Sequence, residues 1–106
     1  MADDIEVRDN PEAGRYEVRT GGELAGFAVY VRRGDHVIFV HTEIDPAFEG
    51  RGLGSALARG ALDDVRRQGA PVLPLCPFIA GWIEKHPGYD DLVDHELLAQ
   101  LDAGRP

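Results

Sequence analysis

The sequence predicts a mixed α/β fold, in which four antiparallel strands lead into a crossover helix, a parallel fifth strand and a C-terminal helix. Three observations support this prediction. Apolar and polar residues alternate in the N-terminal part of the chain, as in strands with one wet face. The spacing of apolar residues in 51–68 is that of an amphipathic helix. A short apolar run follows at 72–75, and a helical crossover makes the strand after it parallel to the strand before it.

The first 44 residues are expected to form two hairpins. The predicted strands are 5–8, 16–19, 24–32 and 36–44. Turn residues separate them, including Gly21-Gly22, which suits a tight hairpin. The apolar density of the fourth strand predicts a central position covered on both faces. Because side chains alternate along a strand, His41 and Glu43 should share one face and Thr42 should lie on the other.

The C-terminal half is expected to be mostly helical. Gly69 is placed to cap the helix at 51–68, and Pro71 prevents its continuation. Pro74 in the short fifth strand cannot donate a ladder hydrogen bond, which predicts an unpaired edge there. A second helix is predicted at 78–85 and a third at 92–101. The predicted fold core spans about 4–93, followed by a C-terminal tail at about 94–106 whose last residues, 102–106, should be loose.

A glycine-rich turn between the fourth strand and the first helix is the strongest local signal. Gly50, Gly52 and Gly54 allow a backbone with positive φ to come close to a ligand. The first amides of a helix and its dipole favour an anion such as phosphate. The spacing fits neither the ATPase loop, which needs Gly-Lys-Ser/Thr, nor the dinucleotide fingerprint Gly-x-Gly-x-x-Gly. Taken alone, the turn is also compatible with a tight structural connection.

Length and charge limit the classes of function. The 106 residues correspond to one domain, 1–106. A formal net charge of -8 argues against nucleic acid and favours cationic partners, although acidity also serves solubility. No apolar run suits a membrane span or an export signal, so a cytoplasmic, monomeric protein is expected. Cys76 is the only cysteine, and the spacing of Cys and His residues predicts no disulfide and no metal site.

Three motifs occur in order along the chain. The first is His41-Thr42-Glu43, and the second is the strand-to-helix turn Glu49-Gly50-Arg51-Gly52-Leu53-Gly54. The third is Cys76-Pro77-Phe78, which is followed by Trp82-Ile83-Glu84-Lys85-His86-Pro87-Gly88-Tyr89. This arrangement resembles the GNAT superfamily of N-acetyltransferases, whose turn reads Gln/Arg-x-x-Gly-x-Gly/Ala. The likeness covers about 23–92 and is greatest to a group of single-domain GNAT-like proteins of about this length. Glu49 stands where the family has Gln or Arg.

The resemblance implies a minimal GNAT-like fold that binds acetyl-CoA. In the family, the fourth and fifth strands splay apart, and pantetheine lies in the gap like an added strand. This implies that 41–44 contacts the pantetheine arm and 50–55 the pyrophosphate. The residues expected to contact acetyl-CoA are Thr42, Ile44, Glu49, Gly50, Arg51, Gly52, Leu53, Gly54 and Ser55. The family's helices between the first two strands and its final hairpin are missing here, which leaves the acceptor side open.

Catalytic residues are expected on the fourth strand. Acetyl transfer requires an amine without its proton, and a carboxylate or an imidazole can remove that proton. Glu43 is the first candidate for this base and His41 the second. Either residue is also compatible with a solvated or hydrogen-bonded strand position, His41 more so than Glu43. The family often supplies a Tyr on the helix after the fifth strand as the acid for the leaving thiolate, but Ile83 stands at that place, and Tyr89 is more typical of a core residue.

Cys76 is a further catalytic candidate. It lies directly after the fifth strand and before Pro77, which suits the first position of a helix. The helix N-terminus favours a thiolate, and a thiolate can take an acetyl group by thioester exchange. We hypothesise that Cys76 is the nucleophile with His41 or Glu43 as its base. A single cysteine among apolar residues is also typical of an inert core, in which case transfer is direct with Glu43 as base.

Two functions follow from these patterns. The first is an acetyl-CoA-dependent N-acetyltransferase acting on an unidentified amine, for which the acidity favours a polyamine or a Lys-containing peptide. The alternative is a non-catalytic module that binds coenzyme A or acetyl-CoA and regulates or buffers without turnover. The missing Tyr and the open acceptor side favour the alternative. Both predict binding of coenzyme A.

Overall fold

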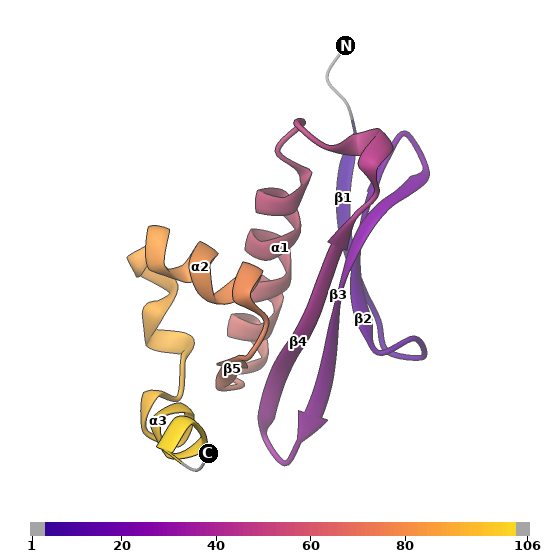
Figure 1. Cartoon of the computed structure of the whole chain (residues 1–106). Coiled ribbons are helices and arrows are strands. Elements are labelled where there is room, and N and C mark those ends of the chain that lie inside the picture. The colour runs from indigo at the N-terminus through magenta and orange to yellow at the C-terminus, as the bar shows by residue number, and fades with distance from the viewer. Residues whose placement is uncertain (1–3, 104–106) are drawn as a thin grey trace.

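The computed structural model describes residues 4–103, which form one twisted five-stranded sheet with helices after the fourth and fifth strands (Figure 1). The strands are β1 (Ile5–Asn10), β2 (Arg15–Thr20), β3 (Glu23–Arg33), β4 (His36–Ile44) and β5 (Val72–Pro74). They lie in the order β1-β2-β3-β4-β5. The first four pair antiparallel, and β5 pairs parallel with β4. The predicted mixed sheet is therefore confirmed.

The helical elements follow β4. They are a 3-10 turn (Pro46–Phe48), α1 (Leu53–Gln68), α2 (Pro77–Lys85), a second 3-10 segment (Pro87–Leu92) and α3 (His95–Ala103). Gly69 ends α1 in the left-handed region at φ 69°, as predicted.

The third helix, expected at 92–101, is present as α3, which runs from His95 to Ala103 through most of the segment expected to follow the fold core. The Asp94 carboxylate accepts the Leu97 amide at 3.0 Å, which caps this helix. The Asp94 amide in turn donates to the Val72 carbonyl at 3.1 Å, which holds the start of α3 beside β5. The end of the expected loose segment, 104–106, lies outside the described residues.

Helix α1 covers one face of the sheet (Figure 1). A Cβ added to Gly60 would lie 2.7 Å from the Cβ of Val7, so α1 packs against β1 at the distance that only glycine permits. Residues that pair across neighbouring strands lie on the same face of the sheet. Val7 pairs with Val18, Val18 with Gly26 and Gly26 with Ile44, so these four residues lie on the face that α1 covers. The opposite face has no helix over β1 and β2 in this view (Figure 1).

The core lies between this face of the sheet and helices α1 and α2. Its largest fully buried side chains include Tyr16, Phe39, Leu57, Leu62 and Ile79. The expectation that β4 is covered on both faces is wrong for its second half, where Val40, His41 and Glu43 are exposed. Strand β4 has a neighbour on each edge, but β5 is only three residues long, and the His41 and Glu43 side chains stay exposed on the face opposite α1.

Candidate functional site

Strands β4 and β5 separate after three residue pairs. The last pair is Phe39 with Pro74, and just beyond it the Cys76 amide donates to the Phe39 carbonyl at 2.9 Å. The register between β3 and β4 also shifts at this point. Tyr30 pairs with Phe39 but Val29 pairs with His41, which leaves Val40 as a bulge. A bulge bends its strand and interrupts pairing. Among the described strands, none pairs with residues 40–44 of β4 on the edge away from β3.

Exposed apolar side chains mark the elements on both sides of this separation. Val40 is 40% exposed at the bulge, Leu75 is 38% exposed directly after β5, and Phe78 is 41% exposed in the first turn of α2. Large apolar side chains that stay in contact with water indicate a surface that a ligand or partner covers. The gap between β4 and β5 thus offers unpaired backbone groups together with apolar side chains.

His41 and Glu43 lie next to each other, as their spacing predicted. The Nε2 atom of His41 is 2.8 Å from a Glu43 carboxylate oxygen, and both side chains are more than half exposed. Glu43 pairs with Phe27 in the sheet, whereas its neighbour Ile44 pairs with Gly26 on the α1 face. The His41–Glu43 pair therefore occupies the face opposite α1. Because solvent screens it, this contact contributes little to stability.

Thr42 and Cys76 meet on the α1 face instead. The Thr42 hydroxyl lies 3.2 Å from the Cys76 sulfur, and Cys76 is only 3% exposed at the N-cap of α2. The structure therefore does not bring Cys76 to the base expected for it, since alternation along β4 turns His41 and Glu43 to the other face. A thioester in the gap would have the thiol on one side and the carboxylate on the other.

The glycine turn after β4 has the open backbone that an anion requires. Gly50 and Gly52 have φ of 83° and 75°, and a Cβ at either would meet no atom within 4 Å. Gly52 is the N-cap of α1, and the first helical bond runs from the Ala56 amide to the Gly52 carbonyl. The amides of 53–55 precede that bond and have no helical acceptor. They are available to a phosphate at the N-terminal end of α1.

Several residues of the turn pack against, or hydrogen-bond to, other parts of the protein. A Cβ on Gly54 would lie 2.9 Å from the Phe78 ring, so this glycine lets α1 and α2 approach. Leu53 is buried, and the Ser55 hydroxyl accepts the Trp82 indole N–H at 2.8 Å. Arg51 stacks on the Phe48 ring at 5.3 Å, and Glu49 is exposed. Leu53, Gly54 and Ser55 therefore have packing or hydrogen-bonding roles, whereas the backbone of the turn and the exposed side chains of Glu49 and Arg51 remain available to a ligand.

No tyrosine hydroxyl lies at the gap. Ile83, which occupies the place of the family's Tyr, is 4% exposed in the core. The Tyr89 hydroxyl donates to Asp63 at 2.7 Å, and burial together with that carboxylate raises the pKa of Tyr89. The Tyr16 hydroxyl donates to Asp64 of α1, and the Tyr30 hydroxyl donates to Asp9 of β1. Sequence spacing could not reveal these pairs, because the partners lie 21 to 48 residues apart.

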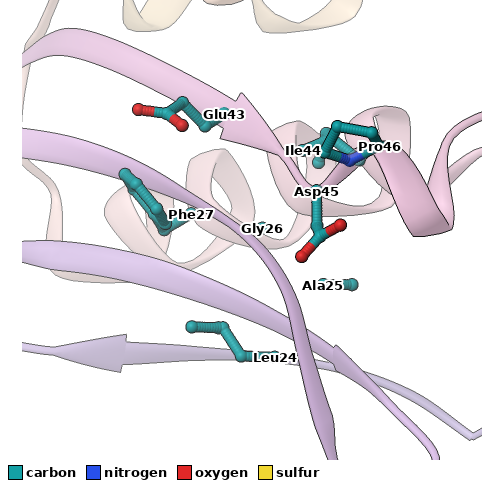
Figure 2. A pocket seen from close by; sticks show the side chains of 8 residues that line it. All are labelled: Leu24, Ala25, Gly26, Phe27, Glu43, Ile44, Asp45 and Pro46. Carbon is teal, nitrogen blue, oxygen red and sulfur yellow. The ribbon is translucent and has the colours of Figure 1, made fainter.

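A hollow of about 200 Å³ opens where β3 begins and β4 ends, and sequence reasoning missed it (Figure 2). It is lined by Leu24, Ala25, Gly26, Phe27, Glu43, Ile44, Asp45 and Pro46. The carboxylates of Glu43 and Asp45 contribute negative charge, although one Asp45 oxygen accepts the Ala47 amide at 2.9 Å. Two carboxylates at one hollow favour a cation. The hollow depends on the pairing of Gly26 with Ile44, which only the register reveals.

Comparison with known proteins identifies the family. Residues 15–92 match the family described as GCN5-related N-acetyl-transferase. The chain belongs to this family. A solution NMR structure of a GCN5-like protein from Staphylococcus aureus, described as a candidate N-acetyltransferase, is similar in fold: the TM-score is 0.64 at 17% identity, over 83% of this chain and 86% of that one. No curated protein matches the chain.

Membership of the acetyltransferase family agrees with the gap between β4 and β5 and with the glycine turn. Among residues 4–103, no group of three His, Cys, Asp or Glu side chains has the arrangement of a metal site. No helix in that range is long and apolar enough to span a membrane.

Proposed function

We propose that this protein is an acetyl-CoA-dependent N-acetyltransferase. The observation that carries the proposal is the unpaired edge of β4 at 40–44, which ends next to the glycine turn at 50–55. The amides of pantetheine pair with this edge as an added strand would, and the pyrophosphate accepts the free amides at the start of α1. Exposed Val40 and Phe78 cover the apolar part of the pantetheine arm.

The reaction proceeds by direct transfer on the face of β4 that carries His41 and Glu43. Glu43 takes a proton from the ammonium group of the acceptor, directly or through one water, and His41 holds the carboxylate in place. The amine nitrogen then attacks the thioester carbonyl carbon and releases its second proton to solvent, so that a C–N bond forms and the C–S bond breaks. The CoA thiolate leaves and takes a proton from solvent, because no tyrosine hydroxyl among residues 4–103 lies at the gap.

The acceptor in this proposal is a cationic amine such as a polyamine or a Lys-containing peptide. Glu43 and Asp45 line the hollow beside the reacting face (Figure 2). The net charge of -8 attracts cations over longer distances. We further propose that the enzyme acts as a cytoplasmic monomer.

A second route passes through Cys76. Its thiolate would attack the thioester carbonyl and release CoA, and the acetyl-sulfur bond would then break on attack by the amine. The position of Cys76 beside Thr42, where β4 and β5 separate, favours this route. The burial of the thiol and its separation from His41 and Glu43 favour direct transfer.

The alternative function is a module that binds coenzyme A without turnover. The burial of Ile83 at the place of the family's acid and the bond from Tyr89 to Asp63 favour this function. Both functions require binding of CoA, so amine-dependent turnover distinguishes them.

Isothermal titration with CoA and acetyl-CoA, followed by a thiol-release assay with polyamines and Lys-containing peptides, tests the proposal. We expect saturable binding of both ligands and thiol release that depends on the amine. Glu43→Gln should retain binding and lose about 100-fold or more in turnover, whereas Glu23→Gln, at an exposed position of β3, should retain both. Absence of binding contradicts both functions, and binding without turnover on any amine supports the module.

A further inference from the structure

A second cavity of about 350 Å³ lies between the sheet and α3. The bulge at Val40 separates it along β4 from the hollow beside Glu43 and Asp45, which we call the acceptor hollow. It is lined by Val31, Arg33, His36, Ile38, Val40, Leu73, Leu97 and Leu101. We call it the α3 groove. Six of these eight side chains are aliphatic, and three of them, Val31, Val40 and Leu101, are 40% to 44% exposed. Neither the acetyl group nor the acceptor described above accounts for this apolar surface.

The α3 groove lies on the same face of the sheet as His41 and Glu43. Val31 pairs with Ile38, and Ile38 pairs with Leu73, so these side chains form one row. Their neighbours Tyr30 and Phe39 are buried on the α1 face. Val40 belongs both to this groove and to the bulge at which β4 and β5 separate. The groove therefore begins where the gap between the strands begins.

We propose that the α3 groove binds the alkyl chain of an acyl-CoA longer than acetyl-CoA, so that the enzyme transfers medium-chain acyl groups. This inference rests on the proposed function. A pantetheine arm anchored at 50–55 runs along β4 from Ile44 toward Val40. Carbons beyond the thioester then continue past Val40 along Ile38 and Leu73.

The order of sites along β4 assigns the groove to the acyl chain rather than to the acceptor. The acceptor hollow uses Glu43 and Asp45, at one end of the strand. The groove uses Val40, Ile38 and His36, toward the other end. The thioester lies between the two, so the amine approaches from one side and the acyl chain extends to the other.

The lining of the groove suits an uncharged chain. His36 Nε2 lies 2.8 Å from the Asp94 carboxylate, so the polar edge of this imidazole already has a partner. Arg33 lies in the exposed end of β3, at the rim of the groove. The remaining lining is aliphatic, and its exposed members, Val31, Val40 and Leu101, gain from losing contact with water.

Titration of the full chain with CoA, acetyl-CoA, butanoyl-CoA and hexanoyl-CoA tests the inference. We expect affinity to rise about threefold with each methylene, close to the roughly fourfold of complete burial, so that the four additional methylenes of hexanoyl-CoA give about an 80-fold preference over acetyl-CoA. Val31→Trp should fill the groove and remove this preference while leaving the affinity for CoA unchanged. Ile5→Trp, at a similarly exposed position of β1, should keep the preference.

Equal affinity for acetyl-CoA and hexanoyl-CoA would overturn the groove assignment and leave the proposed function standing. Absence of binding by every thioester and by CoA would overturn both. A chain preference that survives Val31→Trp, or that Ile5→Trp removes equally, also overturns the assignment. Should Val31→Trp fail to fold, Leu101→Glu places a charge at an exposed lining position and must lower the affinity for hexanoyl-CoA selectively.

Discussion

The Thr42 hydroxyl lies 3.2 Å from the Cys76 sulfur, on the face of β4 opposite Glu43. This contact separates two chemical routes that the sequence alone left open. A base that serves the amine sits on one side of the strand, and the only thiol of the chain sits on the other.

We predict that Cys76 is not acylated during turnover, because no base reaches its buried sulfur. Cys76→Ala should retain at least about half of the amine-dependent thiol release. Its stability should fall by about 1 kcal/mol through the small cavity. Intact mass measurement after incubation with acetyl-CoA should show no hydroxylamine-labile acetyl group on the parent protein. Such an adduct, together with loss of turnover in Cys76→Ala, would establish the covalent route.

The glycine turn gives a second prediction. Gly52→Val forces a branched residue into the left-handed region at φ 75°, which costs about 1 to 3 kcal/mol of stability and displaces the amides that face the pyrophosphate. We expect the affinity for CoA to fall at least about tenfold by titration. Gly34→Val, at φ 57° in the β3–β4 turn, has similar strain and equally open surroundings, so it should lose stability but bind CoA normally. Equal CoA affinity in both variants would remove the turn from the binding site.

Close packing of α1 on the sheet gives a third prediction. Gly60→Ala brings a methyl group within 2.7 Å of the β-branched Val7 and should lower the free energy of unfolding by about 1 to 3 kcal/mol. Gly81→Ala in α2 meets no atom within 4 Å and should raise it by about 0.5 to 1 kcal/mol through helix propensity. Chemical denaturation of both variants measures the difference. The packing account is wrong if Gly60→Ala proves as stable as Gly81→Ala.

Glu17 gives a prediction about acid stability. Its burial opposes ionisation, but hydrogen bonds from Arg15 at 2.8 Å and Asn10 at 3.2 Å outweigh burial and lower the pKa of Glu17. A folded-state pKa below the unfolded value contributes stability above the unfolded pKa, and that stability is lost as pH falls through the folded pKa.

Glu17→Gln should therefore cost about 1 to 3 kcal/mol at pH 7, and the difference from the parent should shrink as the solution is made more acidic than the unfolded pKa of Glu. Urea unfolding across that range measures the difference. Glu12→Gln, at an exposed turn position, serves as the control and should match the parent throughout. A cost for Glu17→Gln that is independent of pH would show that the carboxylate charge contributes nothing.

Patterns within short stretches of the sequence predicted most of the fold. Alternation predicted that His41 and Glu43 share a face, and Gly69 marked the end of α1 where the structure has it. The third helix was placed too early, because Pro87–Leu92 forms a separate 3-10 segment and Asp94 caps α3 through contacts with β5. Such contacts depend on residues distant in sequence, which periodicity does not record.

The candidate site was predictable only in part for the same reason. The three motifs indicated the glycine turn, but the partner of Ser55 is Trp82, 27 residues away. The bulge at Val40 and the hollow beside Glu43 arise from how β3 pairs with β4. The alternation of side chains along β4 could not indicate that Cys76 lies beside Thr42, because β5 and α2 determine the position of the thiol.

Backbone amide NMR during titration with CoA tests the central claim most directly. The account predicts that the largest chemical-shift changes fall on 40–44 and 50–55, and that the amides of β4 on its unpaired edge become protected from hydrogen exchange. The β1–β2 hairpin, from Ile5 to Thr20, should be unaffected. Saturable binding with shifts confined to the β1–β2 hairpin, and an unprotected β4 edge, would contradict the account.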